Sequence, residues 1–386
     1  MKLLHTSDWH LGHQLYGYDR DEEQRDMLDQ MVSLVARHRP DVFLLSGDVY
    51  HTSQPSAAVQ RLFAETLIRI HTACPSMRII VTAGNHDSGA RLEIFRTPWQ
   101  ALGVDVVGHI DRDDPLSHIV RVEGKGYVVA VPYCYERALP PDFFQQLLDT
   151  VAAENTAHLP VVLMAHTTIQ GCDYKGHDTP TDRTVGGIDA LALDRLGHGY
   201  DYLALGHIHH EQWVHGARPH ARYSGSPLPV SFDECYEHSV SIVHLSDSQV
   251  ETEREVIANP RPLVTLPASG AADWDTARKL LQDFPADIPA YVRLRVEVDD
   301  FLPPQASAEA EAIAAEKSCR FCTVQVCRKQ KTQALSGGMT VEEFREQNPI
   351  DIVRRYAEDQ GIAFGPELEE LFCQAVRAAE ADGQQD

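Results

Sequence analysis

The stretch MKLLHTSDWH, residues 1–10, joins a short apolar run to Asp8 and His10, two residue types that bind metal ions. Apolar runs of this length, bounded by polar residues or glycine, are typical of buried strands. Side chains two positions apart in an extended segment share one face. The stretch therefore predicts a strand that carries a pair of metal ligands beyond its carboxyl end.

Four further apolar runs are followed by residues with carboxylate, amide or imidazole groups. They lead into Ser46-Gly47-Asp48, Gly84-Asn85-His86-Asp87, Ala165-His166 and Gly206-His207-Ile208-His209. In open α/β sheets, ligands bind beyond the carboxyl ends of the strands, so five such loops can converge on one spot. A single match of this kind is usually an ordinary surface or capping residue. Five matches in order argue against chance.

The donor types of the series indicate which ions it would bind. Carboxylate, imidazole and amide oxygen suit Mn²⁺, Fe²⁺ or Zn²⁺ better than Ca²⁺. The series contains no cysteine, so it does not indicate a structural zinc site with thiolate ligands. Two ions about 3.5–4 Å apart can clamp a phosphate group and activate a water molecule, and Asp48 is a candidate for the carboxylate that bridges them. The series points to a two-metal phosphoesterase.

These segments resemble the calcineurin-like metallophosphoesterases and, within them, the SbcD-type nuclease subunits of bacterial SbcCD complexes. The likeness is carried by KLLHTSDWHLG at 2–12, SGDVY at 46–50, AGNHDS at 83–88, ALGHIH at 204–209, YSGSPLP at 223–229 and SFDE at 231–234. It covers about residues 1–257 with specific motifs. Beyond them the layout is similar but the sequence likeness is weak.

The resemblance implies a role for each residue of the series. Two divalent ions, with Mn²⁺ the expected species, would each have four ligands and share the bridging carboxylate. The first set would be Asp8, His10, Asp48 and His209, and the second Asp48, Asn85, His166 and His207. His86 would be no ligand, but would protonate the leaving oxygen or stabilise developing charge. Asp87 would either orient the His86 imidazole or cap its loop.

The resemblance also implies fold and activity. The fold would be an α/β/β/α sandwich over residues 1–257, with a small α+β capping domain at 263–335 and a helical tail at 340–386 that binds an SbcC-like ATPase. The enzyme would be a hydrolase that cleaves DNA as a double-strand exonuclease and a single-strand and hairpin endonuclease. It would act as a homodimer within an ATP-dependent heterotetramer in DNA repair, recombination and replication.

The apolar pattern of the first 262 residues agrees with this organisation. Helical spacing occurs at 20–37, 56–70 and 141–155, and two strand-like runs occupy 239–257. The apolar face at 56–70 either packs in the core or forms a dimer contact. The stretch ANPRP at 258–262 is typical of a linker.

The carboxyl-terminal third shows a weaker pattern of the same kind. Alternation at 291–298 predicts a strand, the Ala- and Glu-rich stretch 305–317 predicts a helix, and 321–326 predicts another strand. Gly337 and Gly338 mark a second break. The short amphipathic helices expected beyond them either pack on the domain or dock in a groove of a partner.

Composition bounds the surroundings of the protein. A length of 386 residues allows two or three domains. The net charge of −23 is unusual for a nucleic-acid-binding protein, although two divalent ions would add about +4 locally and a partner could help to hold DNA. No apolar run of membrane-spanning length occurs. No signal segment is evident, and the eight cysteines are scattered, so a cytoplasmic protein with reduced thiols is expected.

Two other functions fit part of the pattern. A cyclic-nucleotide phosphodiesterase or a protein phosphatase could use the same metal series, because function depends on the site and its surroundings rather than on the fold. The predicted cap and tail and the late YSGSPLP motif argue against it. A scaffold that uses the metals only structurally is disfavoured by His86, an imidazole that coordination does not require.

Overall fold

The computed structural model describes residues 1–135, 138–173, 190–216, 220–246, 249–299 and 301–328, together with 350, 353–354, 365, 368–369 and 372. Residues 1–328 belong to one unit. The break at Gly337 and Gly338 lies outside the described residues, as does nearly all of the tail predicted at 340–386. Within the described part of the chain, no helix is both long and apolar enough to cross a membrane.

The first sheet begins with the amino-terminal strand. Its described strands lie in the order β14-β13-β1-β4-β5-β6. They are β1 (Lys2–Thr6), β4 (Val42–Ser46), β5 (Arg78–Thr82), β6 (Val104–Val107), β13 (Ser239–Ser246) and β14 (Gln249–Val256). In this sheet β1, β4, β5 and β6 are parallel to one another, and β13 pairs antiparallel to β1. Parallel strands covered on both faces are apolar throughout, which explains the continuous apolar runs.

The second sheet has a similar plan. Its described strands lie in the order β11-β12-β10-β9-β8-β7. They are β7 (Ile119–Val122), β8 (Gly126–Ala130), β9 (Val161–His166), β10 (Tyr202–Gly206), β11 (Gln212–Trp213) and β12 (His220–Tyr223). Strands β8, β9, β10 and β12 are parallel. The predicted ligand-bearing runs thus form the inner parallel strands of both sheets.

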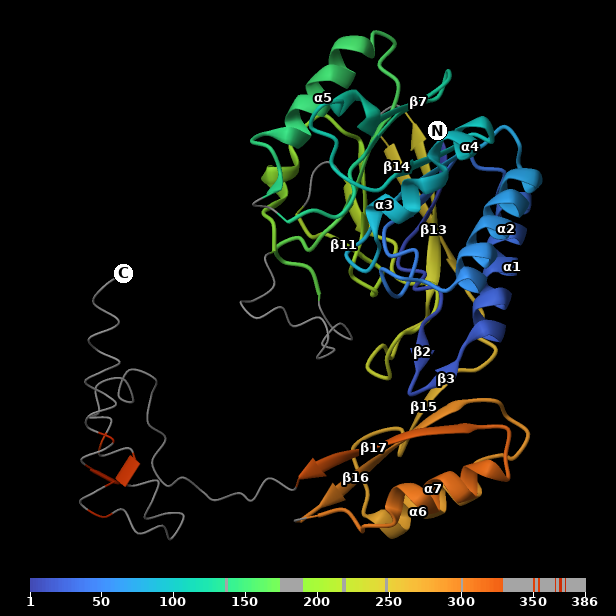
Figure 1. Ribbon diagram of the computed structural model, residues 1–386, viewed down its shortest axis with the longest axis vertical. Helices are drawn as coiled ribbons and strands as arrows, with labels where there is room; N and C mark the ends of the chain where they lie inside the picture. Colours follow the sequence, from blue (N-terminus) through green and yellow to red (C-terminus); the bar gives the residue numbers. More distant parts are fainter. Residues whose placement is uncertain are drawn as a thin grey trace. The chain divides into compact units, whose positions relative to one another are not determined.

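The two sheets pack face to face between two layers of helices (Figure 1). Residues such as Leu44 and Met164 fill the core between the sheets. Helices α1 (Asp21–His38) and α2 (Ala57–Ala73) cover the first sheet, and α5 (Phe143–Glu154) covers the second. The predicted α/β/β/α sandwich is confirmed.

Short elements connect the layers. They are β2 (Gln14–Leu15), β3 (Tyr18–Asp19), α3 (Gly89–Leu92), η1 (Glu93–Phe95), α4 (Arg96–Ala101), η2 (Pro115–His118) and η4 (Leu193–Leu196). Ser56 caps α2 by accepting a hydrogen bond from the Val59 backbone N–H at 3.3 Å. The apolar face predicted at 56–70 packs in the core through residues such as Phe63 and Leu67. Of the two predicted functions of this face, core packing and a dimer contact, the structure therefore supports core packing.

Residues 263–328 form a small sheet unit with its own apolar core. Its parallel strands are β15 (Leu263–Leu266), β16 (Tyr291–Val298) and β17 (Arg320–Arg328), and its helices are α6 (Trp274–Asp283) and α7 (Ala306–Ala315). The predicted strands and the Ala-rich helix are present. The sequence did not predict β15 or α6, because a strand of four residues shows no clear alternation and α6 buries only Ala277 and Leu281.

Candidate metal centre

The predicted ligand series is contributed by both sheets and not by one. Loops after β1, β4 and β5 come from the first sheet, and β9 and the loop after β10 come from the second. The sheets meet at this edge, where the His166 Nδ1–H donates to the Ser46 backbone oxygen at 2.8 Å. The structure brings all seven predicted ligand residues into one cluster. They are Asp8, His10, Asp48, Asn85, His166, His207 and His209.

The four side chains predicted for the first ion face one another. The His10 Nε2 atom is 3.2 Å from the Nε2 of His209 and 3.7 Å from the Oδ2 of Asp48. One donor atom each from Asp8, His10 and His209 lies within 4.8 Å of the others. All four side chains are buried. Their role as ligands stays a prediction, and their arrangement fits it.

The set predicted for the second ion adjoins the first. The Asn85 Oδ1 atom is 3.0 Å from the Nε2 of His166 and 2.9 Å from the Nδ1 of His207. The Asp48 Oδ2 atom is 3.5 Å from the same His166 nitrogen. Asp48 Oδ2 therefore lies close to ring nitrogens of both sets, the position that a bridging carboxylate requires.

Four of the predicted ligands have left-handed backbone conformations. The φ angles are 55° at Asp8, 44° at His10, 49° at Asp48 and 95° at His207. Residues other than glycine adopt such angles at a cost of about 1–3 kcal/mol each, and they cluster at functional sites. The strand ends are thus bent to turn these side chains toward one point.

Two glycines of the motifs are required by close approach. A Cβ atom on Gly47, whose φ is 86°, would overlap the Nδ1 of His166, and one on Gly84 would overlap the Asp48 carboxylate. Glycine therefore precedes Asp48 and Asn85 because the backbone of each loop lies against a ligand of another loop.

Hydrogen bonds behind the ligands fix two of the imidazoles. The His209 Nδ1 atom is 3.2 Å from the buried Glu234 carboxylate, and the Nδ1 of His166 donates to a backbone oxygen. Each bond leaves Nε2 facing the cluster, as is common for metal-bound histidines. Sequence reasoning missed this function of Glu234. Its only signal was its place in the SFDE motif.

The electrostatics of the cluster fit cations. Although burial opposes the shift, the Asp48 carboxylate raises the pKa of His166 to about 9, and Glu234 does the same for His209. Buried carboxylates require a compensating positive charge, which protons on the imidazoles or metal ions can provide. Carboxylate, imidazole and amide donors suit divalent transition metals. The residues present therefore fit two such ions.

His86 lies beside the ligands and is held by the backbone. Its Nδ1–H donates to the His51 backbone oxygen at 2.9 Å, and its own backbone N–H donates to Asp48 Oδ1 at 2.9 Å. Ring nitrogens of His10, His51 and His86 also lie within 4.8 Å of one another. Nδ1 of His86 is therefore engaged by a carbonyl oxygen, and the function of His86 stays a prediction.

Asp87 forms hydrogen bonds of the loop-cap type. Its carboxylate accepts from the backbone N–H groups of Val49, Tyr50 and Gly84 at 2.9–3.0 Å. It therefore ties the loop after β4 to the loop after β5. Desolvation and the nearby Asp48 carboxylate raise its pKa to about 7. Of its two predicted functions, these contacts match the cap, and the orientation of His86 by Asp87 stays a prediction.

Tyr133 is a further residue of the site that sequence reasoning missed. Its ring centroid is 6.2 Å from that of His166 and 6.4 Å from that of His207. Its backbone N–H donates to the Ala83 oxygen at 2.8 Å, which anchors it to the end of β5. Tyr133 follows an apolar strand as the ligands do, but tyrosine is not a residue type that the predicted chemistry sought.

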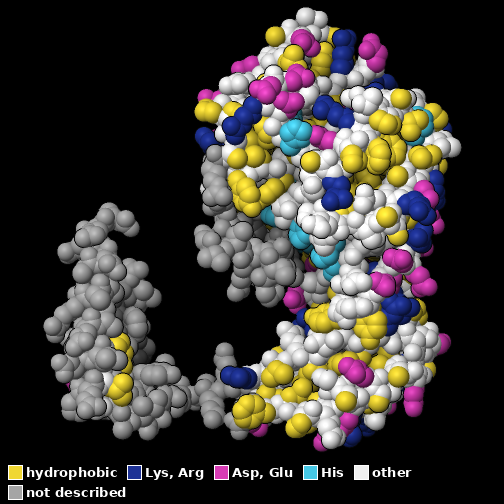
Figure 2. Space-filling view, in the orientation of Figure 1, with side chains coloured by type: hydrophobic (Ala, Val, Ile, Leu, Met, Phe, Trp, Pro, Cys, Tyr) yellow, Lys and Arg dark blue, Asp and Glu magenta, His cyan; other side chains and the backbone are white. Residues whose placement is uncertain are grey.

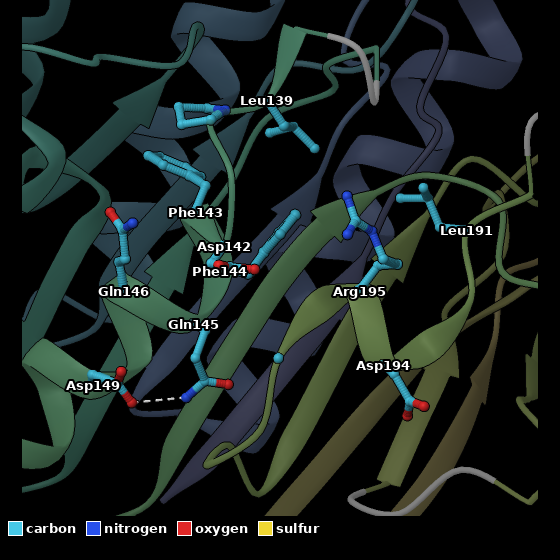
Figure 3. A pocket seen from close by; sticks show the side chains of 12 residues that line it. Leu139, Asp142, Phe143, Phe144, Gln145, Gln146, Asp149, Leu191, Asp194 and Arg195 are labelled. Atoms are coloured by element: carbon cyan, nitrogen blue, oxygen red, sulfur yellow. Dashed lines mark hydrogen bonds between the residues drawn. The ribbon is translucent and has the colours of Figure 1, made fainter.

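A separate cavity of about 430 Å³ lies between α5 and η4 (Figure 3). Its lining includes Phe143, Arg195 and Asp149, whose carboxylate accepts from Gln145 at 2.8 Å. No predicted ligand lines it. Several histidine side chains also reach the face of the molecule shown in Figure 2. Within the metal centre Asn85 is exposed, and His86 and His207 are partly exposed, so the centre is open to solvent and distinct from this cavity.

Comparison with known proteins gives consistent matches. The family model of the calcineurin-like phosphoesterases matches residues 1–211, a range that contains every predicted ligand. The D subunit of the nuclease SbcCD from Rhodobacter capsulatus is 30% identical, covering 70% of this chain and 73% of that protein. Its counterpart from Bacillus subtilis is 31% identical, with 78% and 80% covered. That from Escherichia coli strain K12 is 27% identical, with 87% and 88% covered.

Proposed function

We propose that this chain is the nuclease component of a DNA-processing complex, because it belongs to the calcineurin-like phosphoesterases and, within them, to the D subunits of the SbcCD nucleases. Its substrates would be DNA phosphodiester bonds, cleaved from duplex ends and within single strands and hairpins. The observation that carries the proposal is the position of Asp48 Oδ2, 3.7 Å from His10 Nε2 and 3.5 Å from His166 Nε2. One carboxylate can thereby join two metal sites.

The two predicted sets would hold two divalent ions, and Mn²⁺ is the species we propose. Mg²⁺ suits the site less, because it prefers oxygen ligands and binds imidazole weakly. When bound, the ions would supply positive charge to the phosphate oxygens and favour deprotonation of the attacking water. The left-handed loops and the hydrogen bonds behind His166 and His209 orient the donor atoms before any ion arrives.

His86 would act on the leaving oxygen. Its Nδ1–H is bound to the His51 carbonyl, so in the protonated ring Nε2–H is the donor we propose for the leaving oxygen. As the bond from phosphorus to the leaving oxygen breaks and a bond to the water oxygen forms, this proton would pass to the leaving alkoxide. His86 is partly exposed, so a substrate phosphate can reach it.

The partners we propose are DNA, an SbcC-like ATPase and a second copy of this chain, in an ATP-dependent heterotetramer for DNA repair and recombination. The small sheet unit would form the core of the capping domain at 263–335, and residues 340–386 would dock on the ATPase. For the homodimer, the apolar face of α2 is already used in the core. Exposed Ile94 and Phe95 of η1 offer an apolar surface instead.

The direct test is hydrolysis of duplex, hairpin and single-stranded DNA with Mn²⁺, with Mg²⁺ and with a chelator. We expect cleavage that depends on Mn²⁺, with Mg²⁺ a poorer activator, and about two bound ions by metal analysis. Cleavage of cyclic nucleotides or phosphoproteins without cleavage of DNA would favour the other phosphoesterase functions. A metal content of zero or one would contradict the two-ion site.

The partner proposal is tested by deleting residues 340–386. Elements beyond a glycine-rich break rarely support the core of the preceding domain, so the shortened protein should keep its metals and its Mn²⁺-dependent cleavage of single strands. It should lose co-purification with the ATPase and ATP-dependent duplex cleavage. Binding of the ATPase at full affinity would locate the docking surface elsewhere, and precipitation would indicate that the tail packs on the domain.

A further inference from the structure

A line of polar and aromatic side chains, partly buried at His51 and buried from His13 onward, connects His86 to the small sheet unit. It begins at His51, whose backbone oxygen accepts from the His86 Nδ1–H and whose ring stacks on the His86 ring. The ring centroids are 5.5 Å apart and the planes differ by 24°. His51 therefore restrains both the position and the rotation of the His86 imidazole ring.

His13 supports the other side of His51. The two ring centroids are 4.5 Å apart at an angle of 64°, the edge-to-face arrangement that aromatic rings prefer. His13 is only 8% exposed, and its backbone N–H donates to the His10 carbonyl at 3.0 Å. It is thus fixed by packing and by the ligand-bearing loop.

Arg20 fixes the orientation of His13. Its Nη1 lies 3.2 Å from the His13 Nδ1 and donates to the Pro229 backbone oxygen at 2.6 Å. A guanidinium has only donors, so Nδ1 of His13 is the acceptor and the neutral ring carries its hydrogen on Nε2. Arg20 is 2% exposed, so water does not compete for this bond.

The small sheet unit closes the line at Tyr291 of β16. The Arg20 guanidinium lies over the Tyr291 ring at 5.9 Å, and the Tyr291 hydroxyl donates to the Glu23 carboxylate of α1 at 2.9 Å. Arg261 and Arg320 also lie over this ring, at 5.8 and 5.5 Å. Tyr291 is fully buried, so the position of β16 determines where the Arg20 guanidinium can lie.

We propose that Arg20 and His13 are positioning residues for His86, and that Tyr291 holds Arg20 in place. The inference rests on the proposed function of His86 as proton donor to the leaving oxygen. The His86 ring contacts the His51 carbonyl and ring and, edge to face at 4.9 Å between centroids, the His10 ring. Because His51 provides both the hydrogen bond and the stacked face, His13 limits the tilt of the His86 ring by packing against His51. Through Tyr291 and Arg20, the small sheet unit would thereby contribute to catalysis.

The test compares two leaving groups in Arg20→Met and His13→Leu. An oligonucleotide leaves as an alkoxide that needs a proton, whereas bis(p-nitrophenyl) phosphate releases p-nitrophenolate, which needs none. Misplacement of a catalytic group by about 1 Å can cost about 100-fold. We expect kcat to fall about 10- to 100-fold for the oligonucleotide and less than about threefold for the aryl ester, with KM and metal content unchanged.

Arg320→Met is the matched control. Arg320 lies over the same Tyr291 ring and donates to its hydroxyl at 2.9 Å and to the Asp19 oxygen at 3.0 Å. It makes no hydrogen bond to His13 among the described residues. Its loss should lower stability without changing the ratio of the two kcat values. The same change of ratio in Arg320→Met would overturn the proposal, because it would trace the effect to loosened packing.

A second readout does not depend on turnover. The sample is metal-free protein labelled with ¹⁵N-histidine, in which the His86 resonance is assigned by its absence in His86→Ala. This resonance should shift in Arg20→Met and in His13→Leu. Arg20→Lys keeps a hydrogen-bond donor at position 20 and should restore part of the natural chemical shift. Equal losses with both substrates, or an unmoved resonance, would overturn the proposal. If His86→Ala itself keeps full activity on the oligonucleotide, the proposed function of His86 fails instead.

Discussion

The metal centre has a buried floor and an exposed rim, and the two differ in how they are held. The floor consists of Asp8, His10, Asp48, His166 and His209, each at most 6% exposed. The rim consists of Asn85, His86, His207 and Tyr133, all at least partly exposed. In the floor, the His166 and His209 side chains are held by hydrogen bonds to residues behind them. The rim loops are tied to the floor through backbone N–H bonds from His86 to Asp48 and from His207 to Asp8.

This difference suggests a division of labour. Buried ligands with fixed tautomers should determine metal affinity and the stability that metal confers. The partly exposed His86 can meet a substrate without being desolvated first, so it should determine chemistry, while the predicted ligands Asn85 and His207 would complete the second metal site. The bonds run from rim backbone to floor carboxylates, so a damaged floor should disturb the rim, whereas truncation of a rim side chain should have a smaller effect on the floor.

Asp48→Ala should give the largest effect, because it removes the bridging carboxylate and the acceptor for the His86 backbone. Both ions should be lost together, and nuclease activity with them. Saturating Mn²⁺ should stabilise the natural protein by about 4 kcal/mol at a thousand times the Kd, seen as a rise in Tm, and this rise should vanish in the variant. Asp105→Ala, which removes a partner of Arg78 outside the site, is the control. A variant that keeps one tight ion would show that Asp48 does not bridge.

His86→Ala should lower kcat about 10²- to 10⁴-fold, the usual range for a general acid, and leave the floor unchanged. Metal content and the Mn²⁺-dependent rise in Tm should match those of the natural protein. The measurements are single-turnover cleavage of an oligonucleotide and metal analysis of the same sample. If the ions are lost with activity, His86 belongs to the floor and the division between the two regions is wrong.

The ligands of both regions could be predicted from sequence because each follows a buried strand and has a metal-binding residue type. Asp48 after Val42–Leu45 and His166 at the end of Val161–Met164 are local signals. The same local apolar runs predicted buried strands, whereas the sandwich was implied by the family resemblance that the motifs carry. That the site joins two sheets was not visible, since the pairing of β1 with β13 and of β10 with β12 depends on distant residues.

The supporting residues could not be predicted for a related reason. Glu234 lies 25 positions from His209, and Arg20 reaches the backbone of Pro229 across 209 positions. Such contacts form only when the loops pack together, and the residues adjacent to Arg20 or Glu234 in the sequence do not predict them. Asp87 is the opposite case. Its place in the GNHD motif suggested that it orients the His86 imidazole, whereas its described hydrogen bonds accept from backbone N–H groups.

Glu234→Ala should produce an intermediate effect confined to one side of the floor. Carboxylates that orient a ligand histidine typically contribute 10- to 100-fold in metal affinity, so the first site, which includes His209, should weaken by about that factor. Calorimetric titration of metal-free protein with Mn²⁺ should show one weakened step and one unchanged step. Glu237→Ala, at an exposed ion pair with Arg254, should change neither. Equal weakening of both steps would mean that Glu234 supports the fold and not the histidine.

Tyr133→Leu should give the smallest effect and tests whether the rim has any influence on the floor. The ring packs near His207 and His166, and aromatic contacts of this kind are worth about 0.5–1.5 kcal/mol, so the second metal site should weaken by about two- to tenfold. Tyr133→Phe keeps the ring and should match the natural protein. Both variants should keep the first site, because none of its ligands lies within the ring contacts of Tyr133. The measurement is the same Mn²⁺ titration, read at its weaker step. An equal loss in Tyr133→Phe would assign the effect to the hydroxyl group, and a change at the first site would show that rim and floor are not separable.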